Sequence, residues 1–177
     1  MSRFLGLLLF LLAPASTLAC DSASLFALVA ERLSYMPAVA EYKYHHGLQV
    51  SDSAREQRVL ESSAAQAQDL GLPADRVLPF MRAQMEAAKV IQRQLLEQWQ
   101  QSGRRDGGDV GDLIATIRPQ LNRLGREQLL EMQCLRERNL QIGDDQRADF
   151  DLALSKIPLP TVVTDDLFRS LQFVSGR

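Results

Sequence analysis

Several kinds of chemistry are missing from this sequence. It has no glycine-rich phosphate-binding loop and no dinucleotide fingerprint, so it gives no support to nucleotide-dependent reactions. Its two histidines, His45 and His46, are adjacent, and adjacent side chains diverge on a helix instead of holding one metal ion together. No serine has a credible histidine partner for nucleophilic catalysis. The basic residues form no stripe and the net charge is −2, so nucleic-acid binding has no support either.

Residues 1–19 have the features of a cleavable secretory signal peptide. A basic residue precedes an apolar core, and Thr17 and Ala19 occupy the −3 and −1 positions of a cleavage site. A retained membrane anchor is the alternative, but the segment is too short for a span. Cleavage would leave Cys20 first, which opens a lipoprotein interpretation; a lipid-attachment site prefers Leu where Thr17 stands. We therefore expect export to the periplasm or the medium, with no membrane association after cleavage.

Two cysteines remain after cleavage, Cys20 and Cys134. In an oxidising compartment an even pair is most simply one disulfide, with two unpaired thiols as the alternative. Such a bond would contribute at most about 4–5 kcal/mol in the chain-entropy model, because it closes a long loop.

The remaining chain predicts an all-α fold. Removal of residues 1–19 from a chain of 177 leaves 158 residues, which suits one domain over 20–177. No convincing strand is present, and segment 102–112 is expected to be a flexible loop. Pro37 should bend the first helix locally, and Gly47 should end it. The apolar spacing predicts a helical bundle with helices at about 22–46, 53–69, 74–101, 112–123, 126–140 and 144–156, and a short last helix capped by Thr164 or Asp165.

Long polar side chains occupy positions where the helical pattern expects core. Arg32 and Lys43 are eleven residues apart, so at about 100° per residue both face the same side of a helix, about 16 Å apart along its axis. The others are Asp52, Arg55 and Glu56 at the start of the second helix, the stripe Gln84, Ala88 and Gln92, and Arg118 late in the fourth helix.

Each of these residues has an ordinary structural explanation when taken alone. A surface arginine usually belongs to a solvated face, and Asp52 is adequately explained as a helix cap. As a set, three arginines and a lysine with few carboxylate partners suggest a ligand with two carboxylates, because the arginine fork matches a carboxylate in bidentate fashion.

The order of these elements resembles the signature of the all-helical chorismate mutases. The run AERLSYMPAVAEYKYHHGLQVSDSAREQRVL shows their pattern of an Arg, a Lys eleven residues later, and an Asp-x-x-Arg-Glu element that begins the next helix. RAQMEAAKVIQ resembles part of their long helix. The signal peptide, the length and the arginine in IRPQLNRL resemble their exported (gamma) class. The resemblance covers about residues 24–124, and residues 125–177 match only in length and helical character.

The resemblance implies roles for residues on the first two helices. Arg32 matches an arginine that binds a substrate carboxylate, and Lys43 matches a lysine that bonds the ether oxygen and a carboxylate. Arg55 matches the arginine of the second helix. Glu56 matches a glutamate that orients the ring hydroxyl, and Asp52 opens the same element and joins the substrate-binding set.

The later helices supply the rest of the implied site. Gln92 falls where the family has Gln or Glu facing the ether oxygen. Arg118 matches an arginine that, in the exported class, comes from the same chain. Ala88 departs from the pattern, because relatives often carry a small polar residue there. Any contact made at that position must come from elsewhere, such as a water molecule.

The implied function is the [3,3] rearrangement of chorismate to prephenate, in the phenylalanine and tyrosine branch, with no cofactor and no metal. The exported class is commonly dimeric, so a homodimer is implied. One alternative is an isochorismate pyruvate lyase on the same scaffold, although such lyases are generally cytoplasmic. Another is an exported helical chaperone or adaptor, which would have no use for four converging cations.

Overall fold

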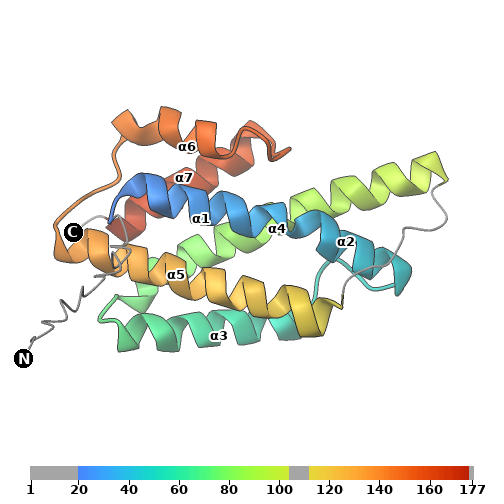
Figure 1. Ribbon diagram of the computed structural model, residues 1–177, viewed down its shortest axis with the longest axis horizontal. Helices are drawn as coiled ribbons and strands as arrows, with labels where there is room; N and C mark the ends of the chain where they lie inside the picture. Colours follow the sequence, from blue (N-terminus) through green and yellow to red (C-terminus); the bar gives the residue numbers. More distant parts are fainter. Residues whose placement is uncertain (1–19, 104–111, 176–177) are drawn as a thin grey trace, which may run out of the picture.

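The computed structural model describes residues 20–103 and 112–175, and within these residues the fold is all-α (Figure 1). The predicted fold class is therefore confirmed. The expected signal peptide, and most of the expected loop at 102–112, lie outside the described residues. No helix in the described part of the chain is both long enough and apolar enough to span a membrane.

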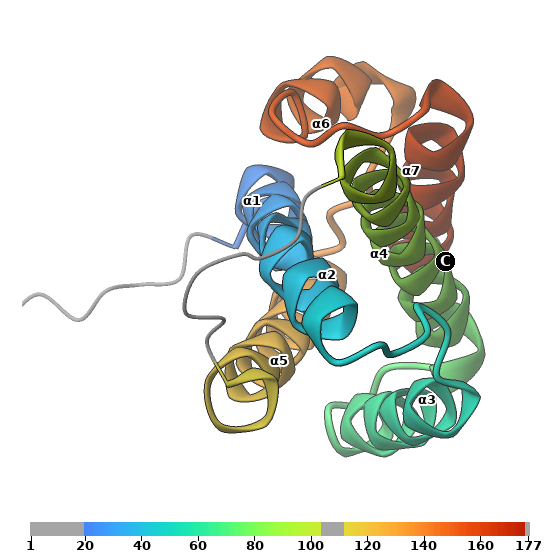
Figure 2. The same cartoon turned by 90° about the vertical axis from the view of Figure 1, so that its right-hand side faces the viewer.

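The helices form three layers that can be followed in both views (Figures 1 and 2). One layer holds α6 and α7, the middle layer holds α1, α2 and α4, and the third holds α3 and α5. The long helix α4 packs against α2, α3 and α7, and so connects all three layers. The bounds are α1 (Ser22–Ser34), α2 (Met36–His45), α3 (Ser53–Asp69), α4 (Ala74–Ser102), α5 (Arg118–Glu137), α6 (Arg147–Ala153) and α7 (Thr161–Ser175).

The first predicted helix is two helices in the structure. α1 ends at Ser34 and α2 begins at Met36, with Tyr35 between them. Pro37 lies in the first turn of α2, where its missing N–H leaves no intrahelical bond unmade. The expected irregularity at Pro37 is therefore present, but the continuous helix over 22–46 is wrong. The predictions for α3 and α4 agree with the structure to within one residue.

The break predicted between residues 123 and 126 is absent, because α5 runs without interruption from Arg118 to Glu137. Gly125 lies inside this helix, where a glycine costs about 1 kcal/mol relative to alanine. The buried side chains of Leu124 and Leu129 and the packing of α5 against α1 outweigh that cost. Arg118 is consequently the first residue of α5, and its predicted place late in a separate helix is wrong.

Short irregular turns precede two helices in the C-terminal half. A π-helical turn, η1 (Leu113–Ile117), leads into α5, and the Asp112 carboxylate caps it by accepting from the N–H groups of Ile114 and Ala115. A 3₁₀ turn, η2 (Asp144–Gln146), precedes α6. The helix predicted over 144–156 is therefore shorter, and α7 begins at Thr161 instead of after Thr164 or Asp165.

The core between the layers is apolar and includes an aromatic cluster. Phe26 of α1 packs edge-on against Phe150 of α6 with ring centroids 5.2 Å apart, and Phe168 of α7 lies 5.2 Å from Phe150. This cluster fixes α6 and α7 on α1. Residues of the C-terminal part thereby support the first helix, which carries Arg32.

Cys20 and Cys134 are joined, with Cα atoms 5.7 Å apart, so the predicted disulfide is confirmed. It ties Cys20, two residues before α1, to the last turn of α5. Because the Sγ of Cys20 is bonded to Cys134, that sulfur cannot carry a lipid in the same molecule.

Candidate active site

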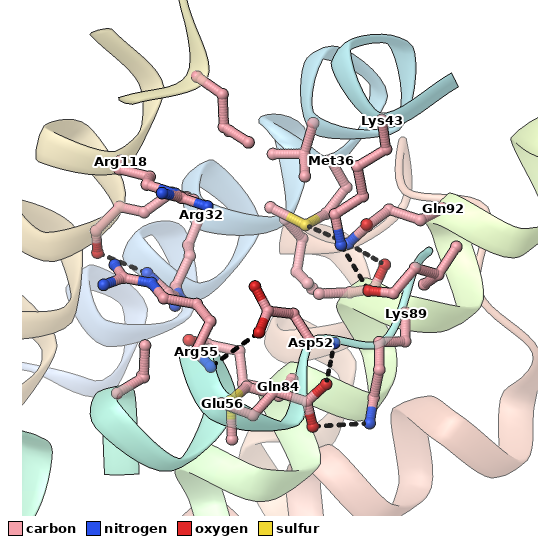
Figure 3. Close-up of a pocket in the computed structure, with 18 of the residues that line it drawn as sticks. Arg32, Met36, Lys43, Asp52, Arg55, Glu56, Gln84, Lys89, Gln92 and Arg118 are labelled. Carbon is pink, nitrogen blue, oxygen red and sulfur yellow. Dashed lines mark hydrogen bonds and ion pairs between the residues drawn. The ribbon is translucent and has the colours of Figure 1, made fainter. Parts of the chain in front are cut away.

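One cavity collects the residues that the sequence analysis singled out (Figure 3). It has a volume of about 140 Å³ and lies where α1, α2, α3, α4 and the start of α5 meet. All the predicted site residues line it: Arg32, Lys43, Asp52, Arg55, Glu56, Ala88, Gln92 and Arg118.

Arg32 reaches the cavity from the last turn of α1. Its neighbours Val29 and Leu33 are buried in the core, and this register fixes the direction in which Arg32 projects. The guanidinium Nη1 donates to the backbone oxygen of Leu121 on α5. Burial and the charge of Arg55 lower the pKa of Arg32 to about 10. The guanidinium is thus poorly solvated and lies close to another cation, and each condition favours the binding of an anion here.

Lys43 lies in the last turn of α2, on the far side of the helix break from Arg32. Its Nζ donates to the backbone oxygen of Val50 in the connection to α3. Burial lowers the pKa of Lys43, and Arg118 lowers it further, whereas Asp52 and Glu56 oppose this shift. One of the three N–H donors is used by Val50, so the others remain for a ligand.

The first turn of α3 holds three of the predicted residues in a fixed arrangement. Asp52 caps the helix by accepting from the N–H of Arg55 at 2.9 Å, and its own N–H donates to Glu56 Oε1 at 3.2 Å. The second Glu56 oxygen accepts from Lys89 at 3.1 Å. Arg55 donates to Asn122 Oδ1 of α5 at 3.3 Å. Burial lowers the pKa of Arg55, as do its cationic neighbours. The cap interpretation of Asp52 is thus correct, and the same cap aims Arg55 and Glu56 at the cavity.

One stripe of α4 lines the cavity with Gln84, Ala88 and Gln92. Gln92 is 4% exposed, and its Nε2 donates to the Ala88 oxygen at 3.1 Å and lies 3.5 Å from Met36 Sδ. An amide nitrogen has two hydrogens, so Gln92 can reorient one toward a ligand. Ala88 offers only its methyl group and backbone, as expected from the departure noted in the sequence.

Arg118 stands at the junction between η1 and α5, next to Pro119. Its backbone N–H donates to Leu113 O, but its side chain makes no hydrogen bond or ion pair within the described residues. Its charge nevertheless lowers the pKa of both Lys43 and Arg55, which shows that the three cations share one electrostatic environment.

The sequence analysis missed several residues of the cavity wall. Lys89 pairs with Glu86 at 2.7 Å and with Glu56 at 3.1 Å; burial lowers its pKa, but these hydrogen bonds raise it overall. Asn122 lines the cavity as well, and so does Gln84, which the sequence placed in the α4 stripe without a role. The spacing of Lys89 from Glu86 was visible in the sequence, but its pairing with Glu56 depends on how α3 packs on α4.

Cations outnumber anions around this cavity. Five cationic side chains line it together with two carboxylates: Arg32, Lys43, Arg55, Lys89 and Arg118 against Asp52 and Glu56. Because Lys89 is held by two glutamates, the remaining cations are available to a ligand. The arrangement suits a small molecule with more than one negative charge, bound in a partly dry site where electrostatic interactions are strong.

Comparisons with known proteins agree with this geometry. Residues 18–93 match the family chorismate mutase type II. The chain is 44% identical over 72 residues to the secreted chorismate mutase of Yersinia pestis, a match that covers 41% of this chain and only 39% of that relative. It is 32% identical over 157 residues to a monofunctional chorismate mutase of Enterobacter agglomerans, which covers 87% of this chain and 83% of the relative.

The fold also matches a solved structure. The crystal structure of the secreted chorismate mutase from Yersinia pestis superimposes with a TM-score of 0.75 at 26% identity, covering 85% of this chain and 96% of the other. Because the match to the Enterobacter agglomerans relative extends over most of both sequences, the chain belongs to the chorismate mutase type II family.

Proposed function

We propose that this protein is an exported chorismate mutase that rearranges chorismate to prephenate in the cavity between α1, α2, α3, α4 and α5. The observation that carries the proposal is the convergence of eight residues from these five helices on one cation-rich cavity. The reaction is an intramolecular [3,3] shift, so it needs neither a nucleophile nor a cofactor. It needs cavity residues that hold the substrate in its folded conformation and stabilise the negative charge that develops on the ether oxygen.

The arginines are assigned to the two carboxylates of chorismate. Arg32 and Arg55 are already oriented by hydrogen bonds to Leu121 and Asn122 of α5, so little side-chain entropy is lost when they bind the substrate. Arg118 adds a third cation from the same helix. Together they would hold the enolpyruvyl ether over the ring, in the compact conformation that the rearrangement requires.

Lys43 and Gln92 are assigned to the ether oxygen. Negative charge grows on this oxygen as the C–O bond breaks, and donors aimed at it stabilise the transition state more than the ground state. Lys43 retains free N–H donors after its bond to Val50. The Gln92 amide donates to Ala88 O and to the weak sulfur acceptor of Met36, and a substrate oxygen would replace Met36 as its second acceptor.

Glu56 and Asp52 are assigned to the ring hydroxyl. Both Glu56 oxygens accept one hydrogen bond within the protein, from Asp52 N–H and from Lys89, and each oxygen has a second acceptor site. The Lys89 ion pair holds the Glu56 carboxylate in place. Ala88 would contribute surface to the substrate-binding wall instead of a hydrogen bond.

Export and assembly complete the proposal. Residues 1–19 are proposed to be a signal peptide, with residues 20–177 as one chorismate mutase domain in the periplasm or the medium. The similarity to a relative named a secreted chorismate mutase and the Cys20–Cys134 disulfide support export. A homodimer is proposed from the resemblance to the exported class and can be tested by light scattering. One chain supplies all the cavity residues named above, so activity should not depend on the dimer.

Incubation of purified residues 20–177 with chorismate tests the function. Loss of chorismate with formation of prephenate is the expected result, and the same protein should release no pyruvate from isochorismate. Unchanged chorismate would refute the proposal, and pyruvate release would favour the lyase alternative. The relatives named above are all called chorismate mutases, which favours neither the lyase nor the chaperone.

A further inference from the structure

Gln84 is a buried amide with no hydrogen bond. Its side chain is 1% exposed, and neither Nε2 nor Oε1 has a partner in the described chain. Two other glutamines are buried in the described residues, and each uses its Nε2: Gln92 donates to Ala88, and Gln128 donates to Leu28. Gln84 also lines the candidate active site. It is therefore a polar group facing a cavity, with its hydrogen-bonding capacity unused.

An amide in this state is unfavourable for folding, because it gives up its bonds to water and gains none. Methionine has nearly the same length and shape without the polar atoms, so packing alone does not require glutamine here. The amide is explained if it bonds a ligand in the cavity.

Gln84 lies at the end of the cavity that is farthest from the proposed ether-oxygen donors. It is eight residues before Gln92, about 12 Å along α4. Gln92 contacts Met36 at the start of α2. At the other end, Arg32 and Arg55 line an adjacent cleft of about 410 Å³ together with Met81, one turn before Gln84. Gln84 is thus placed at the arginine end.

A carboxylate held at the arginine end has acceptor sites to spare. Its two oxygens offer about four lone-pair directions, and a bidentate guanidinium uses two of them. Arg32 and Arg55 already crowd each other, since the charge of Arg55 lowers the pKa of Arg32. A further cation there would be unfavourable, whereas a neutral amide adds a donor without adding charge.

We propose that Gln84 Nε2 donates to a substrate carboxylate at the arginine end of the cavity, as a substrate-binding residue beside Arg32 and Arg55. This inference rests on the proposed function and extends it by one residue. A contact with a carboxylate persists from ground state to transition state, so its loss should raise KM more than it lowers kcat.

The test compares Gln84→Met with Gln128→Met, in wild type that has first been shown to convert chorismate. Gln128 is equally buried but lies in α5 outside the cavity, so it is the matched control. Gln84→Met should keep or raise the melting temperature while kcat/KM falls ten- to a hundredfold, mostly through KM. Gln128→Met should lower the melting temperature and leave kcat/KM within threefold. Calorimetric binding of prephenate, which keeps both carboxylates, should weaken at least tenfold only in Gln84→Met.

Each other outcome overturns the assignment. If Gln84→Met has wild-type kcat/KM and prephenate affinity, the amide binds no substrate. If Gln84→Met and a second variant, Gln84→Leu, both fail to fold, the amide is part of the core. A wild-type protein that does not convert chorismate would overturn the proposed function itself, which is a different result from an active wild type with an indifferent Gln84.

Discussion

Replacement of Lys43 by methionine separates charge from shape at the proposed ether-oxygen site. Methionine keeps most of the length and the apolar stem of lysine but removes the cation. Two opposite effects on the stability of the fold nearly cancel. The bond from Nζ to Val50 O is lost, which removes about 0.5–1.5 kcal/mol, but the cost of burying a cation is lost as well. The free energy of unfolding should therefore change by about 1 kcal/mol or less, a shift of about 2–4 °C in Tm.

The kinetic effect should be far larger. If Lys43 stabilises charge that appears only in the transition state, kcat should fall by about 10²–10³, equivalent to about 2.7–4 kcal/mol. Initial rates of chorismate loss at saturating substrate measure this, alongside thermal unfolding by circular dichroism. Lys156→Met is the matched control, because Lys156 is exposed and does not line the cavity. A Lys43→Met variant with kcat within threefold of wild type would show that the lysine only packs its stem.

The pH dependence supplies a second readout for Lys43. Burial and Arg118 lower its pKa in the free protein, so the cation is lost at a lower pH than for an ordinary lysine. The kcat/KM of wild type should therefore fall on the alkaline side as pH rises through that lowered pKa. Lys43→Met has no proton to lose there and should lack this limb of the profile. An identical alkaline fall in the variant would assign the titrating group elsewhere.

The remaining predictions concern four other parts of the molecule. The rate of Gln92→Glu should fall as pH rises through the pKa of the new carboxyl, because only the protonated carboxyl can donate to the ether oxygen. The wild-type rate should stay comparatively flat over the same range, below the alkaline limb. An equally steep wild-type profile would remove Gln92 from the mechanism. Arg118→Ala should lower kcat/KM ten- to a hundredfold by leaving a carboxylate unpaired, and unchanged steady-state kinetics would exclude α5 from the site. Reduction of the Cys20–Cys134 bond should lower the free energy of unfolding by up to about 4–5 kcal/mol and so lower Tm, with little loss of activity at 25 °C. A thiol titration that finds two free thiols in unreduced protein would contradict the bond. Burial raises the pKa of Glu131, a buried residue of α5, so its contribution to stability is present below the unfolded pKa and is lost as pH rises through the folded one. Glu131→Gln should therefore raise Tm relative to wild type more at pH 7 than at pH 4, and equal differences at the two pH values would refute this.

The sequence by itself determined the local features of this protein. The start of α3 at Ser53, capped by Asp52, follows from side-chain chemistry within a few residues, as does the irregularity at Pro37. Helical periodicity determined the all-α class, because it reports which face each helix buries. The sequence also singled out the eight residues that line the cavity: six by the order of cations and carboxylates, and Ala88 and Gln92 by the stripe on the long helix.

Features that depend on contacts between distant segments were decided only by the tertiary structure. α5 continues through Gly125 because its packing on α1 outweighs the local preference for a break, and this moves Arg118 from a helix end to a helix start. Lys89 is paired with Glu56 only because α3 lies along α4. Gln84 was part of a visible stripe in the sequence, but burial without a partner is a property of the packed interior. Sequence spacing reports neighbours along one helix, whereas burial and pairing across helices depend on how the helices pack together.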